Sequence, residues 1–330
     1  MPVVPHTYNY FGAFALLLRP ESIGSLTIDG GWEMDVGEAS GYLNALIHFN
    51  AEEKGVKRAA FPKPMVLQIL GGDPFLRFHD LEHLLNVVPP NQFLVEVCTA
   101  GLWLKDSRDI GETLDRLQAK VYVLVLDTSR ALLDHIGIQR VEELITEARK
   151  RRIGLYIRCG VSAEAPFPLD LLALEVMNSD TSIIQAVPMT ESLNSATPLL
   201  SETPPLRRRC AESFVFLVTP GGDIYPCARG AGLSALRLGS LKTESISEIL
   251  DRVRPDKPLR HLRQNGPFAL YQAMQQSEHA DRLWPGYLDA CQFHRQALSD
   301  PELSLMAQQE EIYVNPSPTT RRMPLPVLKG

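Results

Sequence analysis

The chain has 330 residues, enough for about two domains or for one large barrel with an additional segment. Apolar residues make up 45% and charged residues 22% of the sequence, which is ordinary for a globular protein and excludes global disorder and a fibrous chain. The formal net charge of −6 provides no broad basic field, so we expect no nucleic-acid partner.

Neither a membrane span nor a secretory leader is visible in the sequence. The longest apolar runs, at residues 11–18 and 121–126, are far shorter than the roughly 20 residues that cross a bilayer. No basic residue precedes Arg19, whereas a signal peptide begins with a charged stretch. The five cysteines are an odd number spread along the chain, which is not typical of a disulfide framework. We therefore expect a cytoplasmic protein without a membrane partner, whose cysteines are buried or bind metal.

Short apolar runs alternate with helical patterns up to about residue 190. The apolar runs predict strands at residues 25–28, 65–70, 93–98, 121–127, 153–158 and 181–187. Periodic apolar positions predict helices at residues 43–54, 79–88, 110–118 and 141–152. Near-continuous apolar strands that alternate with helices are typical of parallel strands buried on both faces. About six β/α units predict an open, partial barrel or a doubly wound sheet, and in both folds ligands gather at the carboxyl ends of the strands.

The pattern changes after residue 190. Residues 189–209 are rich in Ser, Thr and Pro and indicate a linker. Beyond it, apolar residues at 214–218 and 223–225 flank the sequence Thr-Pro-Gly-Gly, which predicts a β-hairpin. Helices are expected at residues 245–253 and 267–276, and the Pro-rich tail from Asn315 is expected to be extended.

The sequence Gly71-Gly72-Asp73 follows the strand predicted at residues 65–70. Two glycines let a ligand approach the backbone closely, and an acid directly after them can accept hydrogen bonds from a ligand amine. The alternative is a simple tight turn in which Asp73 lies near a helix N-terminus for favourable interaction with its dipole.

Other polar residues end the neighbouring predicted strands. Thr99, Asp127 and Arg158 each lie at or near the end of a strand, so a parallel sheet would bring them to one edge. Cys98 and Cys159 lie beside them, and burial is the simpler expectation for both because unpaired cysteine is among the most buried residue types.

The cysteines after the linker form a possible metal-binding set. The predicted hairpin lies between Cys210 and Cys227, so its open ends would bring these two thiols together. Cys291 and His294 add a thiol and an imidazole three residues apart. Three Cys and one His would suit zinc or an iron–sulfur cluster. The alternative is a set of unrelated buried thiols, because the fold would have to close the long gap before Cys291.

Several of these segments resemble motifs of radical S-adenosylmethionine (radical SAM) proteins with a C-terminal SPASM or twitch-type domain. Residues 71–76 resemble the Gly-Gly-Glu-Pro segment of that family, residues 99–101 its Thr-Asn-Gly, and residues 125–127 its Ser-Leu-Asp strand. Cys210, residues 219–227, residues 238–241 and residues 245–250 resemble the start of a SPASM domain, which is the most specific match. The resemblance covers about residues 22–295.

The resemblance implies an α/β fold, with a partial (β/α)6 TIM-like barrel followed by a small α+β SPASM/twitch-like domain that contains the hairpin. The implied division is an N-terminal extension at 1–21, the barrel at 22–190, a linker at 191–209, the auxiliary domain at 210–298 and a tail at 299–330. The residues implied to bind a cofactor, S-adenosylmethionine, are Gly71, Gly72, Asp73, Thr99, Asp127 and Arg158. The residues implied to hold one 4Fe–4S cluster or zinc are Cys210, Cys227, Cys291 and His294.

The sequence also departs from the family pattern. The defining C-x3-C-x2-C loop should follow the first strand, near residues 29–38, but no cysteine precedes Cys98. Without three thiolates in that loop, no cluster can be held there to cleave S-adenosylmethionine reductively. Asp73 replaces the family's Glu, which shortens its reach toward a ligand amine by one methylene. The auxiliary segment also has fewer cysteines than a full SPASM domain.

Three functional hypotheses follow from the resemblance and its departures. The favoured one is a pseudoenzyme, a degenerate radical SAM/SPASM-like protein. It would bind a peptide or protein substrate, or a partner maturation enzyme, in a peptide, protein or cofactor maturation system. The second is an active enzyme that binds S-adenosylmethionine and uses polar rather than radical chemistry. The third is a zinc- or iron–sulfur-binding scaffold or electron-transfer protein, which is compatible with the first.

Overall fold

The computed structural model describes residues 13–18, 33–57, 65–106, 109–161, 167–171, 173, 182–188, 215–227, 230–253, 268–284 and 290–307. The chain forms two compact units. The first unit comprises Met1–Ser195 and Glu212–Arg252, and the second comprises Ala196–Ala211 and Val253–Gly330. The first unit is therefore assembled from two separate stretches of the sequence.

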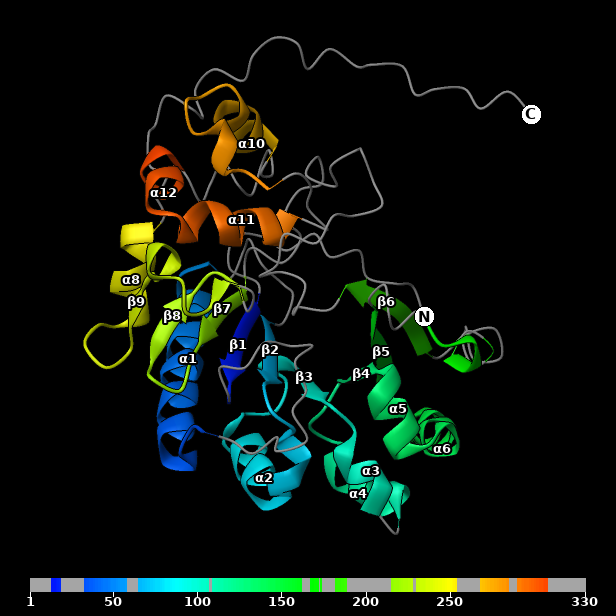
Figure 1. Ribbon diagram of the computed structural model, residues 1–330. Helices are drawn as coiled ribbons and strands as arrows, with labels where there is room; N and C mark the ends of the chain where they lie inside the picture. The colour runs from blue at the N-terminus through cyan, green and yellow to red at the C-terminus, as the bar shows by residue number, and fades with distance from the viewer. Residues whose placement is uncertain are drawn as a thin grey trace. The chain divides into compact units, whose positions relative to one another are not determined.

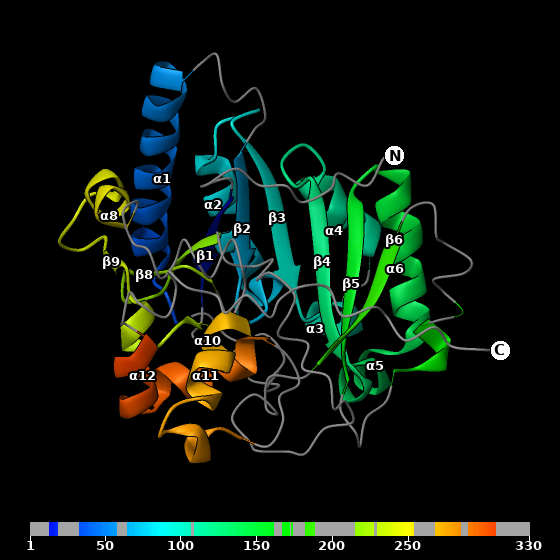
Figure 2. The same cartoon turned by 90° about the horizontal axis from the view of Figure 1, so that it is seen from above.

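Within the described residues, the first unit is built on one sheet with the strand order β6-β5-β4-β3-β2-β1-β7-β8-β9. Strands β1 to β7 pair in parallel, and β7, β8 and β9 pair antiparallel. Figure 2 shows β2 to β6 side by side in this order. The strands are β1 (Ala13–Leu17), β2 (Met65–Leu70), β3 (Phe93–Thr99), β4 (Val123–Ser129), β5 (Gly154–Val161), β6 (Ser182–Pro188), β7 (Val215–Val218), β8 (Asp223–Tyr225) and β9 (Gly239–Ser240).

Helices connect the parallel strands, and α2 to α6 lie along one face of the sheet (Figure 1). The α/β fold with a parallel sheet that the sequence predicts is therefore confirmed. The helical elements of the first unit are α1 (Val36–Lys57), η1 (Pro74–Arg77), α2 (Phe78–Val87), α3 (Leu102–Asp106), α4 (Ile110–Leu117), α5 (Arg130–Ile136), α6 (Ile138–Lys150), η5 (Ser234–Leu236) and α8 (Ile246–Val253).

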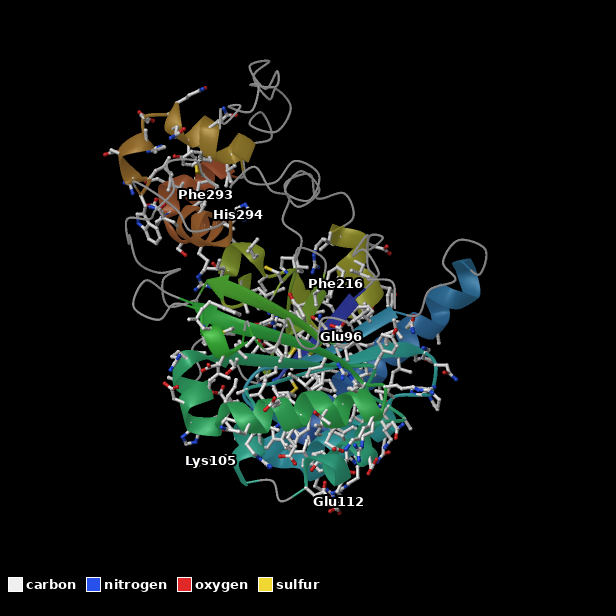
Figure 3. All side chains as sticks on the ribbon, turned by 90° about the vertical axis from the view of Figure 1, so that its right-hand side faces the viewer. Glu96, Lys105, Glu112, Phe216, Phe293 and His294 are labelled. Carbon is white, nitrogen blue, oxygen red and sulfur yellow. The ribbon has the colours of Figure 1, made fainter. Side chains whose placement is uncertain are left out.

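The two faces of the sheet differ in chemistry because side chains alternate along each strand. One row of paired residues crosses five strands and consists of large, buried apolar side chains: Leu16, Ile69, Val97, Leu124 and Leu155. The adjacent row lies on the opposite face and consists of Ala15, Gln68, Glu96, Val123 and Gly154, of which Gln68 and Glu96 are polar. In Figure 3 the labelled Lys105 and Glu112 lie in the helical layer, whereas Glu96 lies in the sheet. The first face therefore packs against the helices, whereas the other face combines the polar Gln68 and Glu96 with a buried apolar cluster that includes Leu17, Leu70 and Val125.

The arrangement differs from the sequence-based division of the chain. Strand β1 falls within residues 1–21, which were expected to be an N-terminal extension, and it lies between β2 and β7 in the sheet. The strand expected at residues 25–28 lies outside the described residues. The hairpin of β7 and β8 was expected in a separate auxiliary domain, but β7 pairs directly with β1 in the first unit. Both differences have one cause: β1 and β7 are far apart in the sequence, and local patterns do not report such pairing.

The described part of the second unit is helical. It contains α10 (Phe268–Gln275), η6 (Ala280–Arg282), α11 (Ala290–Ser299) and α12 (Pro301–Ala307). Its core is a cluster of buried residues: Leu270, Met274, Phe293, Ala297, Leu303 and Ala307. Helix α12 falls in the expected 299–330 tail, and the extended segment expected from Asn315 lies outside the described residues. Across the described part of the chain, every helix is too short or too polar to span a bilayer.

Candidate functional site

Strands β2, β3, β4 and β5 are parallel, so their carboxyl ends lie at one edge of the first unit's sheet, called the carboxyl edge below. The six residues proposed from the sequence to bind a cofactor all lie in the carboxyl-terminal half of these strands or directly after them: Gly71, Gly72, Asp73, Thr99, Asp127 and Arg158. In parallel α/β sheets this edge is where ligands bind. The topology therefore assembles the predicted residues along one edge.

The turn after β2 depends on its two glycines. Gly71 has φ of 92° and Gly72 has φ of 62°, and both values lie in the left-handed region that side chains with a Cβ atom rarely adopt. Leu18, just after the neighbouring strand β1, donates its backbone N–H to the carbonyl of Leu70 at 2.8 Å and so fixes the start of the turn. The turn thus places main chain without side chains at the carboxyl edge, with Gly71 buried and Gly72 half-buried.

The Asp73 carboxylate points into the protein and is fully buried. Its Oδ1 accepts hydrogen bonds from the Thr99 hydroxyl at 2.7 Å and from the Phe75 backbone N–H at 3.1 Å. Its Oδ2 accepts a hydrogen bond from the Leu102 backbone N–H at 2.9 Å. Burial raises the pKa of this carboxyl, and the hydrogen bonds act in the opposite direction. Asp73 therefore caps η1 and joins the turn after β2 to the turn after β3.

Thr99 continues the same network. Its hydroxyl oxygen accepts hydrogen bonds from the Gly101 backbone N–H at 3.0 Å and from the Trp103 indole N–H at 3.1 Å. The Trp103 ring stacks on Phe75 with ring centroids 4.5 Å apart and an interplanar angle of 8°. The sequence gives no sign of this role for Trp103, for which simple packing is the sequence-based expectation. Its position four residues after Thr99, in the first turn of α3, is what brings the indole N–H to the Thr99 hydroxyl.

Asp127 and Arg158 form an ion pair across β4 and β5, at paired positions of the two strands. The Arg158 Nε and Nη2 atoms donate to the two carboxylate oxygens of Asp127, each at 2.5 Å. Such a bidentate pair is stronger and more directional than a single contact. Arg158 Nη2 also lies 3.9 Å from the Cys98 Sγ. Burial raises the pKa of the Cys98 thiol well above its usual range, so this thiol is protonated at neutral pH.

A second polar pair, between Gln68 and Glu96, lies on the same sheet face. Gln68 Nε2 donates to Glu96 Oε2 at 2.7 Å, and both side chains are half-buried. Neither residue belongs to a motif that predicts a site from the sequence. They could have been noticed because each interrupts an otherwise apolar central strand.

The proposed metal ligands are only partly within the described structure. Cys227 lies two residues after the end of β8 in the first unit, and His294 lies on α11 of the second unit, next to Phe293 (Figure 3). Cys210 and the side chain of Cys291 lie outside the described residues. Within the part of the chain that the structure describes, no three His, Cys, Asp or Glu side chains come together as a metal-binding group. The four-ligand site therefore stays a prediction.

The connection from β1 to α1 does not fit an iron–sulfur cluster. This connection, at residues 18–35, is the first loop of the parallel sheet and contains no cysteine. In its described part, the Leu18 carbonyl accepts hydrogen bonds from the Glu33 and Met34 backbone N–H groups at 2.9 and 3.1 Å. Asp35 caps α1 by accepting from the Gly37 N–H at 2.8 Å. The polar side chains of this stretch are carboxylates, hydroxyls and one arginine, whereas iron–sulfur clusters are held by cysteine thiolates.

Comparison with known proteins identifies solved structures of similar fold. Neither a protein-family model nor a curated protein sequence matches the chain. The chain is similar to the solved structure of native anSMEcpe with bound AdoMet and the Cp18Cys peptide, with a TM-score of 0.52 and 12% identity over 89% of this chain and 99% of that chain. Native anSMEcpe with bound AdoMet gives a TM-score of 0.47 and 15% identity over 89% of this chain and 99% of that chain. SuiB of Streptococcus suis bound to S-adenosylmethionine gives 0.39 and 13% over 93% of this chain and 77% of that chain.

The first of these similarities extends over nearly the whole of both chains, so it is a likeness of architecture and not of one motif. The parallel α/β sheet of the first unit matches the fold seen in radical SAM enzymes. The class of architecture that the sequence resemblance implied is thereby confirmed.

Proposed function

We propose that the chain is a degenerate radical SAM/SPASM-like protein. It binds S-adenosylmethionine at the carboxyl edge and acts as a substrate- or partner-binding component in a peptide, protein or cofactor maturation system. It does not cleave S-adenosylmethionine reductively.

The architecture supports the binding part of this proposal. The glycine turn after β2 leaves main-chain groups at the carboxyl edge, and the Asp127–Arg158 pair lies on two further strands of that edge. The solved structure of similar fold contains AdoMet together with a peptide. A nucleoside-containing amino acid and a peptide are therefore the ligand classes that we propose for this chain.

The observation that carries the loss of radical chemistry is the cysteine-free connection between β1 and α1. A 4Fe–4S cluster that donates an electron to S-adenosylmethionine needs several thiolate ligands in one loop. Residues 18–35 provide none. The proposed protein is therefore a binding scaffold that uses the carboxyl edge for its ligand and whose first loop cannot hold the cluster.

The test combines binding with turnover. Calorimetric titration with S-adenosylmethionine is expected to show saturable binding to the wild-type protein. Gly72→Val is expected to abolish it, because φ of 62° excludes a β-branched residue. Gly232→Val is the matched control, since Gly232 also has positive φ but belongs to the connection between β8 and β9 and not to the ends of β2 to β5.

Turnover is measured after anaerobic reconstitution with iron and sulfide and reduction with dithionite. No 5′-deoxyadenosine is expected above the level of a reaction without protein. Stoichiometric 5′-deoxyadenosine would overturn the proposed loss of radical chemistry. Absence of saturable binding to the wild-type protein, or affinity unchanged in Gly72→Val, would overturn the proposed ligand site.

A second candidate function is a zinc- or iron–sulfur-binding scaffold that uses Cys210, Cys227, Cys291 and His294. The observation in its favour is that Cys227 lies two residues after β8, close to the hairpin, and is only half-buried. Iron, sulfide and zinc are measured after anaerobic purification. About four irons or one zinc per chain, lost in Cys227→Ala and kept in Cys98→Ala, would support the scaffold. A metal-free, folded protein would exclude it.

A further inference from the structure

We propose that Asp73 and Thr99 are a positioning pair that locks the turn after β2 to the turn after β3, and that neither side chain contacts the ligand. This inference rests on the proposed function, because the ligand in question is the S-adenosylmethionine assigned to the carboxyl edge. It revises the simplest interpretation of the motif, in which the acid after the two glycines reaches out to a ligand amine.

The hydrogen-bonding capacity of Thr99 is fully used within the protein. A hydroxyl group has one donor and two acceptor lone pairs. The Thr99 hydroxyl donates to Asp73 and accepts from the Gly101 N–H and the Trp103 indole N–H, at distances of 2.7, 3.0 and 3.1 Å. No further hydrogen bond is left for a ligand.

Asp73 is similarly engaged. Both carboxylate oxygens accept hydrogen bonds from the chain, and the residue has no exposed surface. To reach a ligand, the carboxylate would have to abandon the Thr99 hydroxyl and the Leu102 N–H. Buried donors left without an acceptor are costly, so the inward orientation is the favoured one.

The contacts form a closed ring that spans two strand ends. Asp73 binds Thr99, Thr99 binds Trp103, Trp103 stacks on Phe75, and the Phe75 N–H binds Asp73 again. Phe75 lies in η1 after β2, and Trp103 lies in α3 after β3. The ring therefore fixes the relative position of two glycine-containing turns whose backbones line the carboxyl edge.

The substitution Asp73→Glu separates the two interpretations, because they predict opposite results. If Asp73 contacts the ligand but is one methylene too short, Glu restores the reach and tightens binding. If Asp73 is a positioning residue, the longer side chain does not fit a fully buried site, displaces Thr99 or the turn, and weakens binding. We expect the affinity for S-adenosylmethionine to fall about tenfold or more in Asp73→Glu.

Variants of Thr99 test the partner residue. Thr99→Val removes the hydroxyl with little change in shape, and we expect a loss of affinity of about tenfold. Thr99→Ser keeps the hydroxyl, and we expect affinity within about threefold of the wild type. Thr128→Val is the matched control, because Thr128 is a buried strand threonine of β4 whose hydroxyl makes no contact with the ring.

A spectroscopic signal reports on the ring without any ligand. The Trp103 indole N–H is assigned by its loss in Trp103→Phe in a ¹⁵N–¹H spectrum. Because this N–H is buried and donates to Thr99, we expect it to exchange slowly with solvent in the wild-type protein. The protection is expected to be lost in Thr99→Val and Asp73→Glu, and retained in Thr99→Ser and Thr128→Val.

Each outcome has a definite meaning. Tighter binding in Asp73→Glu, or an unchanged indole signal in Thr99→Val, overturns the positioning pair. If the wild-type protein does not bind S-adenosylmethionine at all, the proposed function fails, while the indole exchange still decides whether the pair exists. If Asp73→Glu fails to fold, the comparison of Thr99→Val with Thr99→Ser decides the same question.

Discussion

Arg158 and Asp127 face each other from neighbouring strands and are both mostly shielded from water, with 25% and 13% of their side chains exposed. An ion pair in such a position is costly to break by changing one partner, because the remaining charge stays in a poorly solvated place. The pair therefore contributes to the integrity of the carboxyl edge whether or not a ligand is present.

Asp127→Asn should consequently lower the free energy of unfolding by about 2 kcal/mol, which urea denaturation measures. Asp115→Asn is the matched control. Asp115 also pairs with an arginine, Arg151, but its own side chain is 60% exposed, so the unfolding free energy should hardly change. Equal effects of the two substitutions would show that the Asp127–Arg158 pair has no special structural role.

The buried thiols predict a pH dependence. Burial raises the pKa of Cys159 to about 11, whereas an unfolded chain has a thiol pKa of about 8.5. Between these values the unfolded state has lost a proton that the folded state keeps, so stability falls as the pH rises from about 8.5 towards 11. Below about pH 8 both states hold the proton, and the contribution of this thiol does not vary.

Urea unfolding of the wild type and of Cys159→Ala across this range checks the prediction. The difference in unfolding free energy between the two proteins should be constant at neutral pH and should shift against the wild type above about pH 8.5. A difference that stays constant up to pH 10 would show that Cys159 titrates normally in the folded protein.

At the scale of secondary-structure elements, the strands and helices with strong local patterns were predictable. The expected 65–70 strand is β2, and the expected 110–118 helix is α4 with one residue less. The starts of β4 and α6 shifted by two or three residues, because caps and hydrogen bonds rather than hydrophobicity set the boundaries. Helix α5 was missed, since it is only seven residues long and follows β4 directly, with Ser129 as its cap.

Strand β1 was missed for a different reason. Its five residues, Ala13–Leu17, form an apolar run that fits a strand, but nothing local shows that it pairs with β2 and β7 on either side. The structure makes it a central strand, whereas the sequence suggested a peripheral extension. A central strand and a peripheral extension predict different effects on the unfolding free energy when an apolar residue of β1 is replaced.

Leu16→Ala should lower the free energy of unfolding by about 3 kcal/mol, because Leu16 is fully buried in the middle of β1. Leu169→Ala is the matched control, since Leu169 is 77% exposed and its loss should be nearly neutral. An unchanged unfolding free energy in Leu16→Ala would show that β1 is a dispensable extension.

At the scale of the whole molecule, the class of fold was predictable and the division of the chain was not. Alternating strands and helices indicated a parallel α/β sheet, and its topology then brought every proposed cofactor-binding residue to one edge. The orientation of those side chains could not be predicted, because the inward turn of Asp73 depends on Thr99 and Leu102 from another loop. The hairpin's place beside β1 likewise depends on contacts between distant parts of the chain.

The pairing of β1 with β7 has a consequence for synthesis on the ribosome. One edge of β1 can pair with β2 as soon as β2 leaves the ribosome. The other edge stays unpaired until Val215–Val218, which forms β7, has been synthesised. About 200 residues separate the two strands, so at about 5–20 residues per second the exposed strand edge waits roughly 10–40 s. An apolar strand edge unpaired for that long is a site for aggregation, which makes nascent chains that stall before residue 215 the ones expected to require chaperones.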